Sequence, residues 1–99
     1  MELRILNEIE LKTIYMNDAH RDFPEMELKP WDVVEKLNRE GNYEPLGFFE
    51  NGELTAYALQ VIRKNGKSVL LDYLAVTPKY RDRGVGSAVL KLLREHYHG

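Results

Sequence analysis

The residues whose types and spacing point most clearly to a chemical role form one basic loop, from Arg81 to Ser87. This loop lies between a predicted strand and a predicted helix. The first residues of a helix carry unpartnered backbone N–H groups and a partial positive charge, so a helix start attracts anions. Gly84 and Gly86 lack a Cβ, which lets a ligand approach the backbone closely. Because Arg81 and Arg83 add charges that persist at ordinary pH, the loop predicts a site for a phosphate-bearing ligand.

Two common phosphate-binding loops do not fit this segment. No Gly-Lys-Ser or Gly-Lys-Thr follows at the spacing of a Walker A loop. The run Gly84-Val85-Gly86-Ser87-Ala88-Val89 lacks the third glycine of a Rossmann fingerprint, and the chain ends before the expected ribose-binding acid. A plainer interpretation is a tight strand-to-helix turn with solvated arginines. The order strand, proline, two arginines, helix favours the ligand site.

Two helices are predicted in the first half of the chain. Asn7 and Glu10 form a capping-box pattern after a short strand over residues 2–6. The helix that follows runs to about His20 and is interrupted by Phe23-Pro24; its apolar stripe comprises Leu11, Ile14, Tyr15 and Ala19. A second helix begins near Pro30 and stops near Gly41, with an apolar face made of Val33, Val34 and Leu37.

The second half reads as three strands and a last helix. The strands span residues 46–49, 54–63 and 69–76, and Asn-Gly pairs at Asn51-Gly52 and Asn65-Gly66 separate them. Asn-Gly between apolar runs is the strongest short-range hairpin signal, so these strands are expected to form an antiparallel meander. A helix over residues 84–97 follows. The predicted fold is α+β, sandwich-like, in the order β-α-α-β-β-β-α, within one domain over residues 1–99.

Composition narrows the function classes. A formal net charge of −2 at pH 7 gives no electrostatic case for nucleic-acid binding. No apolar run of roughly 18 residues suggests a membrane span, and the charged start Met1-Glu2-Leu3-Arg4 does not resemble a signal peptide. The chain has no cysteine, and His20, His96 and His98 are too scattered to suggest a metal cluster. We therefore expect a cytoplasmic protein without a metal site.

The segment Val76-Thr77-Pro78-Lys79-Tyr80-Arg81-Asp82-Arg83-Gly84-Val85-Gly86-Ser87 resembles motif A of the GNAT superfamily of acyl-CoA-dependent N-acetyltransferases. That motif reads Gln/Arg-x-x-Gly-x-Gly/Ala, and Arg81, Gly84 and Gly86 fill it. The order of elements also resembles the first part of the GNAT fold. The family continues with a further strand, helix and two strands, which would lie beyond Gly99. Residues 1–99 thus resemble the N-terminal portion of a GNAT acetyltransferase domain.

The resemblance implies acetyl-CoA or coenzyme A as co-substrate and a primary amine of an unknown acceptor as partner. The pyrophosphate would lie on the backbone N–H groups of the loop, and the pantetheine arm would pair with strand 69–76 like an added strand. The implied cofactor-binding residues are Leu74, Ala75, Val76, Arg81, Asp82, Arg83, Gly84, Val85, Gly86 and Ser87. A backbone N–H near Val76 would polarise the thioester carbonyl, and the amine would attack directly.

An attacking amine must be neutral, so a base or a water chain is needed. Asp72 is the weak candidate, because a period of two places it on one face with Leu70, Leu74 and Val76. The interpretation we favour instead puts Asp72 near a strand rim, in water, since acids are rarely buried.

Three other polar residues near the motif receive plainer roles. Asp82 would weaken the attraction for an anion, so it is expected to pair with Arg81 or Arg83 or to face water. The tyrosine that usually serves the family as general acid would lie beyond Gly99. Tyr73 and Tyr80 are assigned to packing.

The segment from His20 to Trp31 is the place where the family commonly builds its acceptor site. Two interpretations stay open: acids such as Glu25 and Glu27 attract a cationic amine, or Phe23, Met26 and Trp31 only pin the segment to the core. Strand 69–76 is a long apolar edge, so a homo-oligomer is expected through it or through the last helix. The alternative to an enzyme is a non-catalytic acyl-CoA-binding or interaction module.

Overall fold

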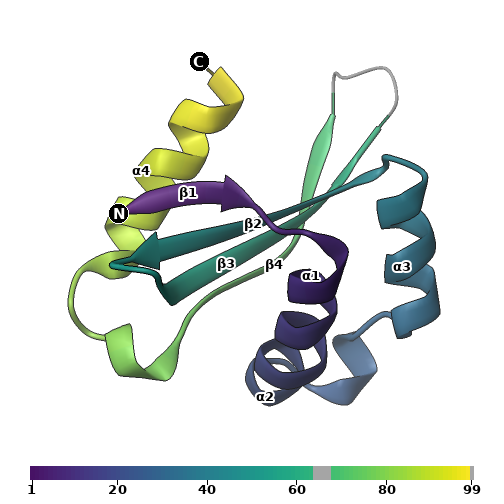
Figure 1. Cartoon of the computed structure of the whole chain (residues 1–99), viewed down its shortest axis with the longest axis horizontal. Coiled ribbons are helices and arrows are strands. Elements are labelled where there is room, and N and C mark those ends of the chain that lie inside the picture. The colour runs from purple at the N-terminus through teal and green to yellow at the C-terminus, as the bar shows by residue number, and fades with distance from the viewer. Residues whose placement is uncertain (64–67, 99) are drawn as a thin grey trace.

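The computed structural model describes residues 1–63 and 68–98. Its elements are β1 (Glu2–Ile5), α1 (Glu8–Ile14), a π-helical segment η1 (Tyr15–Ala19), α2 (His20–Asp22), the 3-10 turn η2 (Glu25–Glu27), α3 (Trp31–Arg39), β2 (Tyr43–Glu50), β3 (Glu53–Ile62), β4 (Val69–Val76), the 3-10 turn η3 (Pro78–Tyr80) and α4 (Val85–His98). The predicted α+β class and the predicted order of elements are confirmed (Figure 1).

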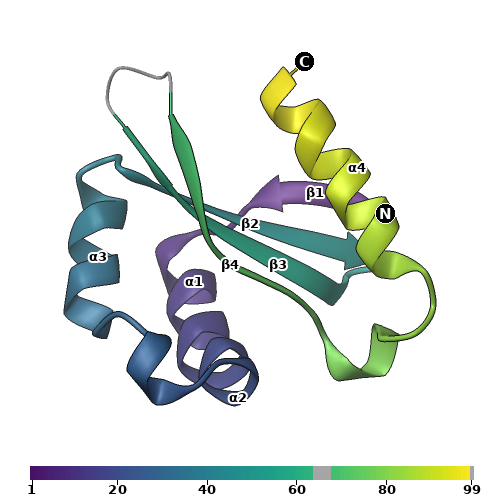
Figure 2. The same cartoon turned by 180° about the vertical axis from the view of Figure 1, so that it is seen from behind.

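One antiparallel sheet in the order β1-β2-β3-β4 separates α1 and α3 from α4. On one face, Tyr57 and Leu59 pack in a cluster with residues of α1 and α3; on the other, Ala56 and Ala58 pack with Val89 of α4. Figure 2 shows the same arrangement from behind, with α4 on the opposite side of the sheet from α1 and α3. Successive residues of β3 thus serve opposite cores, as the two-residue period of a strand requires.

The first helical stretch starts as predicted and ends later. Asn7 accepts a hydrogen bond from the Glu10 N–H, and the Glu10 carboxylate accepts one from the Asn7 N–H, which completes the capping box. The helix continues through η1 and α2 to Asp22, two residues past His20, and stops where Phe23 becomes extended. All four members of the predicted apolar stripe are buried. Sheet contact along this stripe therefore holds the whole stretch against one core.

Helix α3 follows the prediction except on one side chain. It begins directly after Pro30 and stops before Gly41, whose φ of +76° suits a helix end. Val34 is fully buried, whereas Val33 is 40% exposed, so the prediction that Val33 belongs to the apolar face is wrong. The adjacent position along a helix points about 100° away, and only one of two neighbouring valines can face the sheet.

The hairpins are confirmed where the structure describes them. Asn51 and Gly52 both have positive φ, 51° and 81°, in the turn between β2 and β3. The Asn65-Gly66 turn lies outside the described residues, although β3 and β4 on either side of it pair antiparallel. Strand β2 starts earlier than predicted and contains Pro45. The carbonyl of Pro45 accepts from the Leu6 N–H just after β1 ends, so the missing N–H of the proline falls where the ladder stops.

Strand β4 has an irregularity that the sequence pattern did not reveal. Leu59 pairs with Tyr73 and the next residue of β3, Gln60, pairs with Leu71, so Asp72 is an extra residue in the ladder. Leu74 and Val76 pack on the α4 side of the sheet, whereas Asp72 reaches Lys29 on the other side. The prediction that Asp72 shares a face with Leu74 and Val76 is therefore wrong, because the bulge breaks the two-residue period.

Candidate functional site

The candidate site begins at the end of β4, where Thr77 fixes the backbone. The Thr77 N–H donates to the Thr55 carbonyl at 2.8 Å, and its hydroxyl lies 3.2 Å from the Leu54 carbonyl and 3.1 Å from the Thr55 carbonyl. Pro78 then opens η3, which leads through the turn to α4 (Figure 1). These buried bonds tie the start of the Arg81–Ser87 loop to the sheet.

The turn itself uses two left-handed residues. Asp82 has φ of +62° and Gly84 has φ of +74°. Gly86 has no such conformation, and a Cβ built on it would meet no protein atom within 4 Å. Nothing inside the described chain therefore requires glycine at position 86, whereas a ligand lying against the start of α4 would.

The backbone of this turn offers donors. The N–H of Ala88 reaches back to the Gly84 carbonyl at 3.5 Å. The N–H groups of the residues before it, Val85 to Ser87, occupy the first helical positions, which have no acceptor inside the helix. Donors and free space thus coincide, so the residues present fit an anionic group such as a pyrophosphate.

The three basic side chains of the segment differ in their partners. Lys79 pairs with Glu53 at 2.9 Å. Arg81 pairs with Asp22 at 2.9 Å, and its Nε donates to the Val76 carbonyl at 2.9 Å. Arg83 lies 5.8 Å from the Tyr80 ring centre and makes no ion pair within the described parts of the chain. Arg83 is accordingly the side chain whose charge is available to an anion.

The edge of β4 presents alternate backbone groups. Thr77 bonds across the ladder to Thr55, and hydrogen-bonded and non-hydrogen-bonded pairs alternate along an antiparallel ladder. The N–H and C=O of Leu74 and Val76 therefore point away from β3, to the side where the sheet has no further strand, while those of Ala75 face Tyr57. The contact of Arg81 with the Val76 carbonyl agrees with this direction.

Asp72 is largely buried, in contrast to the predicted position near a strand rim in water. Its side chain is 12% exposed, and both carboxylate oxygens lie 2.6 Å from Lys29 Nζ. The Tyr43 hydroxyl is 3.4 Å from Oδ2, and burial beside this carboxylate raises the pKa of Tyr43. The expectation of a solvated strand rim is wrong, because the bulge turns Asp72 toward the core on the α3 side, where a lysine neutralises it.

The other predicted residues near the motif have simpler positions. Asp82 is exposed and makes no ion pair among the described residues, so of its three expected fates it faces water. Tyr73 is buried; its hydroxyl donates to the Glu27 carbonyl at 2.9 Å and accepts from the Lys29 N–H at 3.0 Å. Tyr73 thus packs, as assigned, and also holds the η2 segment against β4.

In the segment from His20 to Trp31, the packing interpretation is confirmed for Phe23 and Trp31 and wrong for Met26, while the attraction of an amine by the acids stays a prediction. Phe23 and Trp31 pack against the core, so they pin the segment. Met26 is 92% exposed and does not pin it, and Glu25 and Glu27 are exposed too. The tip of the segment is therefore polar and accessible while its two ends are anchored.

Sequence reasoning missed Asp22, Lys29 and Tyr57, which the fold brings to the candidate site. Asp22 accepts from Arg81 and from the Tyr57 hydroxyl at 2.7 Å. Each is separated from its partner by more than thirty residues. Residues this far apart in the sequence show no local spacing pattern that would indicate a pair. The one signal in the sequence is Asp22, an acid that follows the apolar stripe of the first helical stretch.

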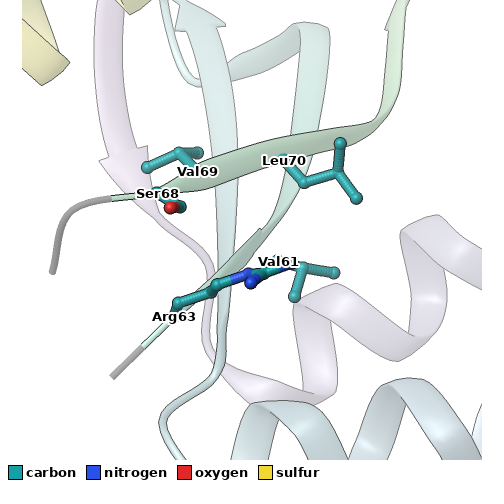
Figure 3. A pocket seen from close by; sticks show the side chains of 5 residues that line it. All are labelled: Val61, Arg63, Ser68, Val69 and Leu70. Carbon is teal, nitrogen blue, oxygen red and sulfur yellow. The ribbon is translucent and has the colours of Figure 1, made fainter. Parts of the chain in front are cut away.

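Two surface hollows lie away from the loop. The larger, about 360 Å³, is lined by Val61, Arg63, Ser68, Val69 and Leu70, at the start of β4 (Figure 3). The smaller, about 230 Å³, lies between α1 and the β2–β3 turn and is lined by Ile9, Glu10, Thr13, Ile14, Phe49 and Leu54. Neither hollow includes a residue of the Arg81–Ser87 loop.

Two absences hold for residues 1–63 and 68–98. No helix there combines the length and apolarity needed to cross a bilayer. No group of three or more His, Asp or Glu side chains in that part of the chain is placed to hold a metal ion.

Comparison with known proteins gives one family. Residues 6–98 match the model of the acetyltransferase (GNAT) family. The ribosomal-protein-S18-alanine N-acetyltransferase of Escherichia coli is similar in structure, with a TM-score of 0.70, 22% identity and coverage of 97% of this chain and 58% of that one. A putative GNAT-family acetyltransferase of Bacteroides thetaiotaomicron gives a TM-score of 0.79, 15% identity and coverage of 97% and 55%.

A third similar structure carries a ligand in its name. Aminoglycoside N-acetyltransferase AAC(6')-Iy in complex with CoA gives a TM-score of 0.59 and 18% identity, over 95% of this chain and 68% of that one. No curated protein sequence matches. The chain spans little more than half the length of the first two structures, and identities this low show the fold alone. The match over residues 6–98 is what decides the family: the chain belongs to the acetyltransferase (GNAT) family.

Proposed function

We propose that the chain binds acetyl-CoA at the Arg81–Ser87 loop and takes part in acetyl transfer to a primary amine. The single observation that carries the proposal is Gly86, a helical glycine that faces open space beside N–H groups of the first helical turn, which have no backbone acceptor among the described residues. Arg83 supplies the free positive charge for the pyrophosphate. Asp82 contributes through its backbone, because its left-handed conformation shapes the turn.

The pantetheine arm would lie along the open edge of β4. Leu74 and Val76 point backbone donors and acceptors to that edge, so an amide-bearing chain can pair there as an added strand does. The backbone N–H and C=O of Ala75 face β3. Ala75 would therefore lie beside the pantetheine arm, between Leu74 and Val76, without a backbone hydrogen bond to it. This edge leads directly from the loop that would hold the pyrophosphate.

The reaction would be a direct transfer. The neutral nitrogen of the amine forms a bond to the carbonyl carbon of the thioester, the C–S bond breaks, and the thiolate leaves and takes up a proton. The outward N–H of Val76 would stabilise negative charge on the carbonyl oxygen. Asp72 would accept the proton of the amine, which requires Lys29 to move off both carboxylate oxygens.

Binding is the first test, because it does not require a complete acceptor site. Titration of the chain with coenzyme A in a calorimeter is expected to show saturable binding. Arg83→Gln is expected to weaken it about tenfold, the value of one charge-assisted contact. Arg94→Gln removes the same charge from an exposed site further along α4 and is expected to leave the affinity unchanged. No binding, or equal loss in both variants, would overturn the proposal.

Turnover separates the enzyme from its alternative, a non-catalytic acyl-CoA-binding or interaction module. The alternative draws support from Asp72, because both oxygens of this candidate base are already bonded to Lys29. Release of free thiol from acetyl-CoA in the presence of primary amines, lost in Asp72→Asn, supports the enzyme. Binding without thiol release supports the module.

The proposal extends to the whole chain: residues 1–99 form one domain, the N-terminal portion of an acetyltransferase domain. The lack of cysteine suits a cytoplasmic location. The chain associates with a second copy through the β4 edge or through α4. Exposed leucines at both places, Leu70 at 64% and Leu90 at 46%, support this last statement.

A further inference from the structure

Asp22, the last residue of α2, is a nearly buried carboxylate with donors on every side. Its side chain is 5% exposed. Arg21 donates to it through Nε at 2.9 Å and Nη2 at 3.1 Å, the Tyr57 hydroxyl at 2.7 Å and Arg81 Nη2 at 2.9 Å. Burying a carboxylate is costly unless it is paired in this way. Such a site fixes the groups around it.

Arg81 is the group of interest, because it is the first residue of the motif. One of its nitrogens, Nη2, reaches Asp22, and another, Nε, donates to the Val76 carbonyl at 2.9 Å. A planar guanidinium with two bonds in one plane has a defined orientation. Its side chain is 48% exposed, so without Asp22 water offers it many other orientations.

The two contacts connect three elements. Asp22 ends the first helical stretch, Val76 ends β4, and Arg81 opens the turn that leads to α4. Tyr57 joins them from the middle of β3 and is fully buried. A rigid sheet and helix therefore hold the first residue of the turn at a fixed place, 59 positions away from Asp22 in the sequence.

The charge of Asp22 supports its contact with Arg81 at neutral pH. Burial alone would raise the pKa of Asp22, but hydrogen bonds from Arg21, Tyr57 and Arg81 outweigh it and hold the pKa below its ordinary value. The carboxylate is therefore ionised at neutral pH, so protonation does not remove its attraction for Arg81 there.

We propose that Asp22 is a positioning residue for the coenzyme A site: it holds Arg81 against the end of β4 and so orders the turn whose backbone N–H groups bind the pyrophosphate. Arg81 then acts through its orientation, and Arg83 supplies the free charge. The inference rests on the proposed function. It also makes the segment that follows Asp22, from Phe23 to Trp31, part of the same rigid unit as the coenzyme A loop.

Coenzyme A affinity in matched variants tests the proposal. Asp22→Asn keeps the shape and removes the charge; Arg81→Lys keeps the charge but cannot make both bonds. Each is expected to raise the Kd about tenfold, and the double variant no more than either alone. Asp18→Asn removes another partner of Arg21 in the same helical stretch and is expected to stay within about twofold. Urea unfolding of each variant confirms that it is folded.

A second readout does not depend on the ligand. The Nε–H of Arg81 is hydrogen-bonded to Val76, so its NMR signal in the wild type is expected to exchange slowly with water and to exchange fast in Asp22→Asn. An unchanged or tighter coenzyme A affinity in Asp22→Asn overturns the proposal, as does additive loss in the double variant. If the wild type binds no coenzyme A, the proposed function fails. Slow exchange lost in Asp22→Asn then still supports the ordering role, and exchange unaffected by the substitution overturns it.

Discussion

Gly84 and Gly86 are two positions apart, and the backbone places different demands on them. Gly84 has φ of +74°, which costs any residue with a Cβ, whereas Gly86 has an ordinary helical position with open space where a Cβ would be. Conformation therefore explains the first glycine. For the second, the proposed coenzyme A site supplies a reason, because a bound ligand would lie where a Cβ would be.

Substitution by alanine is expected to separate these roles. Gly84→Ala should lower the free energy of unfolding by about 1 kcal/mol. Gly86→Ala should leave it unchanged or raise it by up to about 1 kcal/mol, because alanine favours helix, yet weaken coenzyme A binding at least tenfold, a penalty of about 1.4 kcal/mol or more. Urea unfolding and calorimetric titration measure the two effects. A Gly86→Ala protein that binds as well as the wild type would contradict the close approach.

The pair of Lys29 and Asp72 allows a test of burial. Lys29→Met leaves a carboxylate that is 12% exposed without its cation, and we expect a loss of about 1–2 kcal/mol in the free energy of unfolding. Lys79→Met breaks the exposed pair with Glu53, whose side chains are 63% and 49% exposed, and should change nothing measurable. Equal losses in the two variants would show that the burial of Asp72 has no energetic weight.

Sequence reasoning succeeded at residues whose role is set by near neighbours. Asn7 with Glu10, and Asn51 with Gly52, are short patterns with one structural solution each, and both are confirmed. The contacts of Asp22 and Asp72 could not be predicted, for the opposite reason. Their partners Arg81 and Lys29 lie 59 and 43 positions away, and only the assembled sheet brings them together.

At the scale of elements, the start of α1 carries a charge that pH can remove. Hydrogen bonds from Arg4 and from the Asn7 N–H lower the pKa of Glu10 to about 2. The pKa of Glu10 in the folded protein lies below its ordinary value of about 4.3. The ionised carboxylate therefore stabilises the fold at pH values above about 4.3. That stabilisation is lost as pH falls toward 2.

Glu10→Gln isolates this effect, because glutamine can still accept from the Asn7 N–H. Between pH 7 and pH 2.5 the wild type should lose more unfolding free energy than Glu10→Gln, by about 1 kcal/mol after allowance for solvent screening. Urea midpoints across this range measure the difference. Parallel pH profiles for the two proteins would contradict a role for the charge.

Strand β4 shows where an element-level prediction reaches its limit. Its bounds, residues 69–76, match the prediction, since every residue of this run except Asp72 is apolar or aromatic. Its faces do not match along the whole length, because the extra residue Asp72 shifts one part of the strand against the other. The residue types of β4 do not indicate a bulge, so the sequence alone predicts strict alternation of the two faces along the whole strand.

At the scale of the whole molecule, helices cover both faces of the sheet, and its two edge strands are β1 and β4. Val69, Leu70 and Leu71 are exposed by 44%, 64% and 44%, in the strand that ends the sheet order. Exposed apolar edges recruit further strands. The same edge carries the outward backbone groups of Leu74 and Val76, so strand addition and pantetheine binding would compete for neighbouring parts of one surface.

Association through this edge gives the last prediction. Light scattering at micromolar concentration is expected to give at least twice the monomer mass of 11.6 kDa. Leu70→Lys places a charge on the edge and should yield monomers, because charged edge residues block strand pairing. Leu90→Lys makes the same change on the exposed face of α4, where Leu90 is 46% exposed, and should leave the assembly intact. The reverse result assigns the interface to α4, and a monomeric wild type contradicts both sites. Coenzyme A added to the dimer should shift it toward monomer if the ligand and the second copy use the same edge.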